Sequence, residues 1–173
     1  MRVLTTILFA IISAQLFAQE ALSFSDYFKP VWERTKSYTL SVANAMPEEY
    51  YAYKPTDDVK TFGEQMYHIV GNLYGLTSKF VSHKESPMER KEVANLSKAE
   101  IIQSMEDAFD FVSNTLTSMK PSEFDEMTKL FTGDLFPKSH IFILMKDHTA
   151  NHRGQAIVYL RLKNIQPPKY VGW

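Results

Sequence analysis

The sequence predicts an all-α fold, a four-helix bundle with long connections. Apolar residues recur at spacings of three and four in four separate stretches, which is the period of an amphipathic helix. Two of these stretches follow a Ser or Thr that has Glu three positions later, the pattern of a capping box. Prolines and polar segments separate the stretches, and two connections are long enough to let the chain cross over the bundle.

Residues 1–18 carry the pattern of a secretory signal peptide. Arg2 precedes an uncharged apolar stretch from Val3 to Ala18, which ends in small residues. The stretch has 16 residues, fewer than the ~20 that span a bilayer comfortably, so we expect cleavage rather than an uncleaved anchor. No Cys follows it to carry a lipid. We expect residues 19–173 to form one exported domain, periplasmic or secreted, without a stable membrane anchor.

The first two helices are bounded by capping residues and prolines. We expect the first helix to begin near Ser25, a candidate N-cap, and to end before Pro47. A tyrosine-rich loop with the sequence EEYYAYKP follows it. The second helix is expected to begin after Thr61, which with Glu64 forms a capping box, and to continue to about residue 81.

The last two helices are separated by a long connection over residues 121–138. Ser97 and Glu100 form the second capping box and predict a third helix that ends before Pro121. Within the connection we expect a short extended segment at residues 129–132. The fourth helix is expected from Ser139 to about residue 163.

Composition excludes several classes of function. The chain has no Cys, which rules out thiolate metal sites, cysteine nucleophiles and iron–sulfur clusters, so any metal must bind His, Asp or Glu. The formal net charge is −1, from 19 basic and 20 acidic residues, and the two signs are mixed along the chain. No positive stripe is available for nucleic acid, so we expect no nucleic-acid partner.

Two histidines four residues apart suggest a metal site on the last helix. His148 and His152, in the segment DHTANHRGQ, share a helical face, with Cβ atoms about 5–6 Å apart. Ile141 and Tyr159 lie on the same stripe, so this face is expected to point inward. A buried polar group without a partner costs on the order of 1–3 kcal/mol. A divalent cation would satisfy both rings, and so would hydrogen bonds in an ordinary core.

A third ligand would have to come from another helix. His68 lies beside the apolar stripe of the second helix and is the candidate. His83 falls in a polar connection and is expected at the surface. His140 is two turns before His148, about 12 Å along the helix axis, too far to share its ion.

Several short motifs, taken in order, resemble the DinB-like family of helical-bundle metalloproteins. These motifs are Tyr53-Lys54-Pro55, TFGEQMYH at residues 61–68, DHTANHRGQ, Tyr159-Leu160-Arg161 and Pro167-Pro168-x-Tyr170. The resemblance covers most of the chain after residue 18. It implies that His68, His148 and His152 are the metal ligands. It also implies a homodimer, and relatives that include thiol S-transferases, an isomerase that uses a low-molecular-weight thiol, and hydrolases.

Three neutral imidazoles would leave at least one coordination position open for water or substrate. Zn²⁺ fits this ligand set best, and Ni²⁺ or Fe²⁺ would also accept it. Glu64, Asn72, Asn151 and Gln155 are candidates to orient the rings or to act on bound water, although capping or surface positions explain such residues equally well.

Two functions are consistent with this pattern. One is an exported metal-dependent hydrolase or transferase acting on a small molecule; a hydrolase is preferred because low-molecular-weight thiols are mainly cytosolic. The other is a non-catalytic dimeric bundle that serves as a binding or interaction module, with a structural metal or none. The sequence names neither the substrate nor the catalytic residues.

Overall fold

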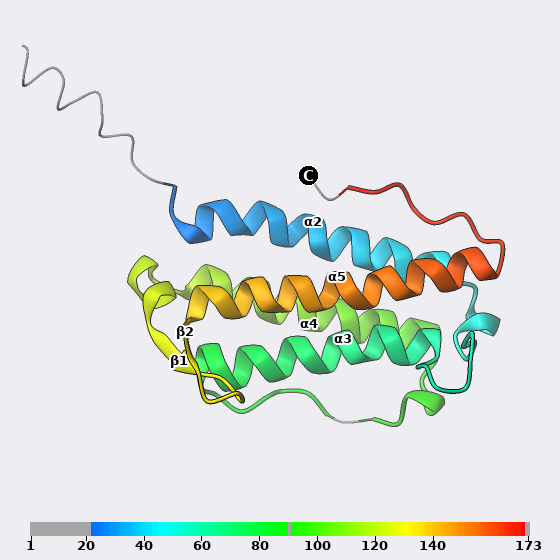
Figure 1. The fold of residues 1–173 in the computed structure, drawn as a ribbon, viewed down its shortest axis with the longest axis horizontal. Coiled ribbons are helices and arrows are strands. Elements are labelled where there is room, and N and C mark those ends of the chain that lie inside the picture. Colours follow the sequence, from blue (N-terminus) through cyan, green and yellow to red (C-terminus); the bar gives the residue numbers. More distant parts are fainter. Residues whose placement is uncertain (1–21, 90, 172–173) are drawn as a thin grey trace, which may run out of the picture.

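The computed structural model describes residues 22–89 and 91–171, and four long helices make up most of them (Figure 1). The helices are α2 (Phe24–Ala45), α3 (Phe62–Leu76), α4 (Lys98–Ser118) and α5 (Lys138–Leu162). The predicted four-helix bundle is confirmed. The predicted leader at residues 1–18 lies outside the described residues. Among the helices that are described, none combines the length and the apolar character needed to cross a membrane.

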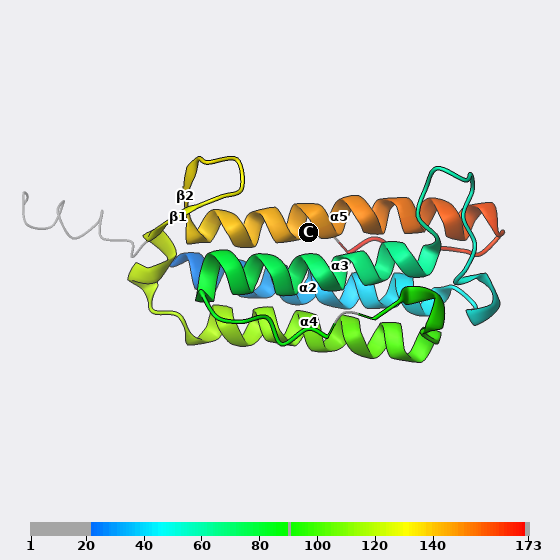
Figure 2. The same cartoon turned by 90° about the horizontal axis from the view of Figure 1, so that it is seen from below.

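The bundle has a crossover rather than simple up-and-down order. Helices α2 and α3 each pack against both α4 and α5. Figures 1 and 2 show that α2 and α5 run in one direction, and that α3 and α4 run in the other. The connection between α3 and α4, described over residues 83–89 and 91–97, therefore runs back along the bundle, and α4 starts beside the start of α3 (Figure 2). This arrangement makes α3 and α5 antiparallel neighbours.

Local capping explains where the helices begin. Both predicted capping boxes are present, Thr61 with Glu64 at α3 and Ser97 with Glu100 at α4. The predicted start of the first helix is wrong by two residues, because Ser23 rather than Ser25 is the N-cap. The Ser23 hydroxyl accepts a hydrogen bond from the backbone N–H of Asp26 at 3.2 Å, and Ser25 is buried.

The predicted extended segment at residues 129–132 is misplaced. The strands are β1 (Met127–Lys129) and β2 (Leu135–Pro137), which pair antiparallel with Thr128 opposite Phe136. Residues 130–134 form the turn between them, where Gly133 has a φ of 93° that favours glycine. The chain therefore reverses where a continuous strand was expected. The fourth helix begins at Lys138, one residue before the prediction.

An apolar core fills the space between the four helices. Its largest fully buried side chains come from all four of them: Trp32, Phe28, Phe62, Phe109 and Phe142. The second helix was expected to continue to about residue 81. This is confirmed, because a π-helical turn over Thr77–Ser82 extends α3. Where α3 faces α5, polar side chains replace part of this apolar packing, and this stretch holds the candidate site.

Candidate metal centre

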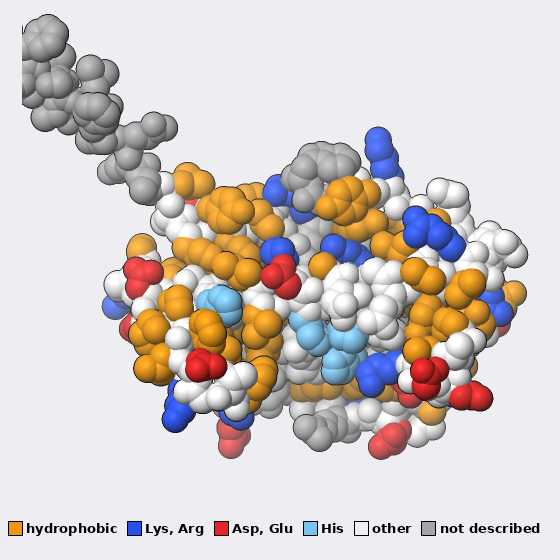
Figure 3. Space-filling model, viewed as in Figure 1, with side chains coloured by type: hydrophobic (Ala, Val, Ile, Leu, Met, Phe, Trp, Pro, Cys, Tyr) orange, Lys and Arg blue, Asp and Glu red, His pale blue; other side chains and the backbone are white. Residues whose placement is uncertain are grey.

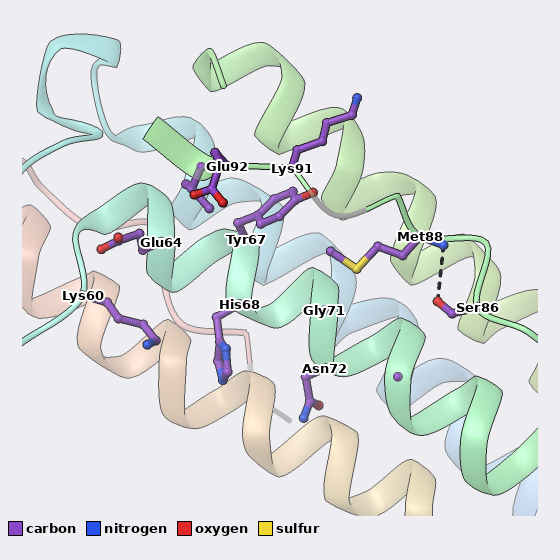
Figure 4. A pocket seen from close by; sticks show the side chains of 12 residues that line it. Lys60, Glu64, Tyr67, His68, Gly71, Asn72, Ser86, Met88, Lys91 and Glu92 are labelled. Carbon is purple, nitrogen blue, oxygen red and sulfur yellow. Dashed lines mark hydrogen bonds between the residues drawn. The ribbon is translucent and has the colours of Figure 1, made fainter. Parts of the chain in front are cut away.

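Three histidine rings meet where α3 and α5 lie side by side. His68 comes from α3, and His148 and His152 come from α5. The ring centroids are 5.1 Å apart for His68 and His148, 4.6 Å for His68 and His152, and 4.5 Å for His148 and His152. Figure 4 shows the His68 side chain directed from α3 toward α5, and Figure 3 shows histidine side chains grouped at the surface there. The structure thus brings together the three residues that the sequence singled out.

The spacing of the ring nitrogens suits a single cation. One nitrogen from each ring lies within 4.8 Å of the others. A tetrahedral zinc site with bonds of about 2.0–2.1 Å places ligand nitrogens roughly 3.4 Å apart, so small side-chain rotations close the difference. The Nδ1 atom of His148 is also buried without a hydrogen-bond partner among the described residues. A ring nitrogen in that state is costly unless something binds it.

The surroundings of all three rings lower their pKa and so favour the neutral state, in which imidazole binds metals. Burial, followed by the charges of His148, His68 and Lys60, lowers the pKa of His152 to about 4. Burial, and then the charge of Lys60, lowers the pKa of His68. Burial, and then the charge of His68, lowers the pKa of His148. Each ring therefore offers a nitrogen lone pair in neutral solution.

A buried glutamine orients one of the rings. The Gln65 side chain is 2% exposed, and its Oε1 lies 2.6 Å from Nδ1 of His152. Its Nε2 donates to Oε1 of Gln155 at 2.7 Å, so the carbonyl oxygen of the amide is the atom that faces the ring. With this amide orientation Nδ1 of His152 carries the hydrogen, which leaves the lone pair of Nε2 free.

The chain of hydrogen bonds continues beyond Gln65. The Gln65 Nε2 also lies 3.4 Å from the Tyr159 hydroxyl, and this hydroxyl donates to the backbone carbonyl of Lys60 at 2.9 Å. The ring of His152 is thereby tied to the loop that precedes α3. Sequence reasoning missed Gln65. The available signal was a polar residue three positions before His68, between the apolar side chains of Phe62 and Met66.

The other sequence candidates occupy different positions. Gln155 belongs to the hydrogen-bond chain through Gln65. Glu64 is exposed, and its carboxylate accepts from the backbone N–H of Thr61 at 2.7 Å, as the capping reading predicted. Asn151 is exposed on α5. Asn72 has a buried Oδ1 without a partner among the described residues, and it lines a cavity that also reaches His68.

The two remaining histidines lie away from the site. His83 is exposed and follows the π-helical turn, with a φ of 53°. The ring of His140 stacks on Phe136, with centroids 4.5 Å apart. The exposed position of His83 is as expected, and neither histidine belongs to the cluster of His68, His148 and His152.

A cavity of about 720 Å³ adjoins the histidines. The exposed His68 lines it together with Lys60, Glu64 and Asn72, and the crossover connection supplies Met88 and Lys91 on the other side (Figure 4). Its volume lies within the usual range of roughly 300–1,000 Å³ for small-molecule sites. Of the three histidines, His68 is the one that lines this cavity.

The fold has counterparts among solved structures. The chain superposes on a DinB-like protein from Bacillus cereus with a TM-score of 0.71 at 17% identity, over 83% of this chain and 95% of the other. A DinB-like protein from Bacillus subtilis gives 0.69 at 16% identity, over 83% and 96%. A conserved protein from Enterococcus faecalis gives 0.64 at 14%, over 82% and 98%. At these identities the likeness establishes the shared fold.

A sequence-family comparison gives the assignment. No curated protein matches the chain. The family model of the DinB superfamily matches residues 32–156, which run from α2 into α5 and include all three histidines. Together with the four-helix bundle and its histidine cluster, this match means that the chain belongs to the DinB superfamily.

Proposed function

We propose that the chain is an exported metal-dependent enzyme, a hydrolase or transferase, in which His68, His148 and His152 hold one divalent cation. The observation that carries the proposal is the convergence of three neutral imidazoles from two helices, with one nitrogen of each within 4.8 Å of the others. Three protein ligands leave a coordination position for water or substrate, the arrangement of catalytic rather than structural zinc sites.

The donor set favours Zn²⁺, and Ni²⁺ or Fe²⁺ also accept three imidazoles. Bound there, the cation supplies Lewis acidity, which polarises a substrate oxygen and lowers the pKa of water. The protein contributes the geometry. Gln65 holds the His152 ring with Nε2 free, and Lys60 adds a positive charge that acts on two of the rings. Asn72 lines the adjoining cavity, and its buried Oδ1 has no partner among the described residues.

The cavity beside His68 supports catalysis over a purely structural metal. A structural site is closed by protein, whereas His68 is exposed and lines a space of about 720 Å³.

The proposal of export depends on the leader pattern, and we prefer a hydrolase to a thiol transferase for that reason. We also propose a homodimer, because the chain resembles the DinB-like family. The non-catalytic dimeric bundle is the alternative, and it requires that the cation, if bound, promotes no reaction.

Metal analysis of protein lacking a His-tag tests the proposal. We expect stoichiometric Zn²⁺, Ni²⁺ or Fe²⁺ in the wild type and its loss in His68→Ala and His148→Ala. His140→Ala is the matched control, because this ring lies on the same helix but stacks on Phe136, and its metal content should be unchanged. Equal metal in all four proteins would reject the site.

Catalysis is tested separately on metal-loaded protein. A panel of ester, amide, phosphate and thiol-transfer substrates should reveal turnover that a chelator abolishes and the metal restores. His148→Ala should lack that turnover. Stoichiometric metal with no turnover on any class would favour the non-catalytic alternative.

A further inference from the structure

A second cavity, separate from the histidine cluster, lies between α2 and α5. Its volume is about 430 Å³. Two arginines and a lysine line it, Arg34 from α2 and Lys146 and Arg153 from α5. No Asp or Glu is among its lining residues within the part of the chain that the structure describes. The cavity therefore presents cationic groups without the carboxylates that usually neutralise them.

The two arginines carry the uncompensated charge. Lys146 has an acidic partner outside the cavity, since its Nζ lies 2.5 Å from the carboxylate of Asp147. Neither Arg34 nor Arg153 forms an ion pair with any carboxylate of residues 22–89 or 91–171. An arginine side chain has five N–H donors in a planar fork that matches an oxyanion.

Arg153 is held in place, and among the described residues its guanidinium donates one hydrogen bond, which leaves other N–H donors for a ligand. Its Nη1 donates to the Thr39 hydroxyl at 3.1 Å, and its guanidinium lies over the Tyr38 ring, 4.6 Å from the centroid. These contacts fix the side chain between α2 and α5. Because the side chain is already held, it loses little conformational freedom when a ligand binds. Burial lowers the pKa of the Arg153 guanidinium, and it still carries its charge at neutral pH.

Aromatic and apolar groups form the remaining wall. Tyr27, Tyr38 and Tyr170 line the cavity, together with Val31 and other small side chains. The rings of Tyr38 and Tyr170 pack edge to face, with centroids 5.8 Å apart. A ligand with a flat apolar body can contact these surfaces while its charged end reaches the arginines.

We propose that the cavity between α2 and α5 is a binding site for a small organic oxyanion, a carboxylate or phosphate on a flat apolar body. The arginine pair binds the oxyanion, and the tyrosines contact the apolar part. The site is independent of the cation site, because its arginines and tyrosines lie on the α2 side of α5, whereas the histidines meet α3.

Calorimetric titration of the tag-free protein with benzoate and with inorganic phosphate tests the proposal. We expect benzoate to bind. Arg34→Gln should weaken binding by at least about tenfold, the size expected for one charge-assisted contact. The Arg34 side chain makes no hydrogen bond within the described residues, so this variant should fold normally. Arg153→Gln should weaken binding further, with circular dichroism to check its fold.

Controls separate this site from other sources of binding. Arg161→Gln, an exposed arginine on the same helix, should bind as the wild type does. His148→Ala should also retain binding; loss in that variant would place the anion at the cation site and overturn the proposal. Failure of the wild type to bind either anion would overturn the proposal as well.

Discussion

Replacing Gln65 with Leu tests whether the hydrogen-bond chain behind His152 sets metal affinity. The substitution keeps the side-chain size and removes the acceptor that lies 2.6 Å from Nδ1 of His152. It also removes the Nε2 donor to Gln155 at 2.7 Å. Because Gln65 is 2% exposed, water cannot replace these contacts freely, and each unpaired buried group costs about 1–3 kcal/mol.

The expected loss of metal affinity is 10- to 100-fold, the usual effect of removing the hydrogen-bond partner of a ligating histidine. This corresponds to about 1.4–2.7 kcal/mol. The assay is a competition titration of Zn²⁺ against a chromophoric chelator at pH 7.5. Gln65→Glu should keep most of the affinity, because a carboxylate still accepts the Nδ1–H hydrogen bond, and Gln155 can turn its amide to donate.

A matched control separates this effect from general damage. Gln103 on α4 is exposed, and among the described residues its side chain donates to Asp107 of the same helix, at 3.0 Å. Gln103→Leu should therefore leave Zn²⁺ affinity unchanged. If folded Gln65→Leu binds Zn²⁺ within twofold of the wild type, the role given to Gln65 is wrong.

Three further predictions concern stability. The unfolding free energy of the metal-free protein should fall as pH drops from 6.5 toward 4. The folded-state pKa of His152 lies at about 4, so the unfolded chain takes up a proton at this histidine first. Urea titrations at pH 7.5 and pH 5 should show a smaller loss of unfolding free energy in His152→Ala than in His140→Ala. Trp32→Ala removes a fully buried side chain and should cost about 3–5 kcal/mol by urea unfolding, whereas Val158→Ala, 48% exposed, should cost less than about 0.5 kcal/mol. Thr61→Ala breaks the capping box of α3 and should cost about 0.5–2 kcal/mol in the same assay; no loss would mean that the cap contributes nothing.

The features predictable from sequence are those that depend on neighbouring residues. A capping box involves four consecutive positions, so Thr61 with Glu64 located the start of α3 correctly. Where two local signals compete, local reasoning is weaker. The N-cap of the first helix was expected at Ser25, whereas it is Ser23. In the first turn the ring of Phe24 packs on Phe124, with centroids 5.2 Å apart, a tertiary contact that a local pattern does not include.

The candidate site was likewise predictable from sequence only where it depends on neighbouring residues. The shared face of His148 and His152 follows from helical geometry, and the structure places both rings together. That His68 meets them depends on the antiparallel contact of α3 with α5, which no local pattern encodes. The sequence suggested His68 through its position beside the apolar stripe of its helix and through family resemblance. The bond between Gln65 and His152 joins residues 87 positions apart, and no local pattern encodes it. That Arg34 and Arg153 line one cavity between α2 and α5 was missed for the same reason.

Anomalous X-ray diffraction at the zinc edge, from crystals of Zn²⁺-loaded protein, tests the central claim most directly. We predict one strong peak between α3 and α5, about 2.0–2.1 Å from a ring nitrogen of each of His68, His148 and His152. A zinc peak elsewhere in the molecule, or one that His68 does not contact, would contradict the account.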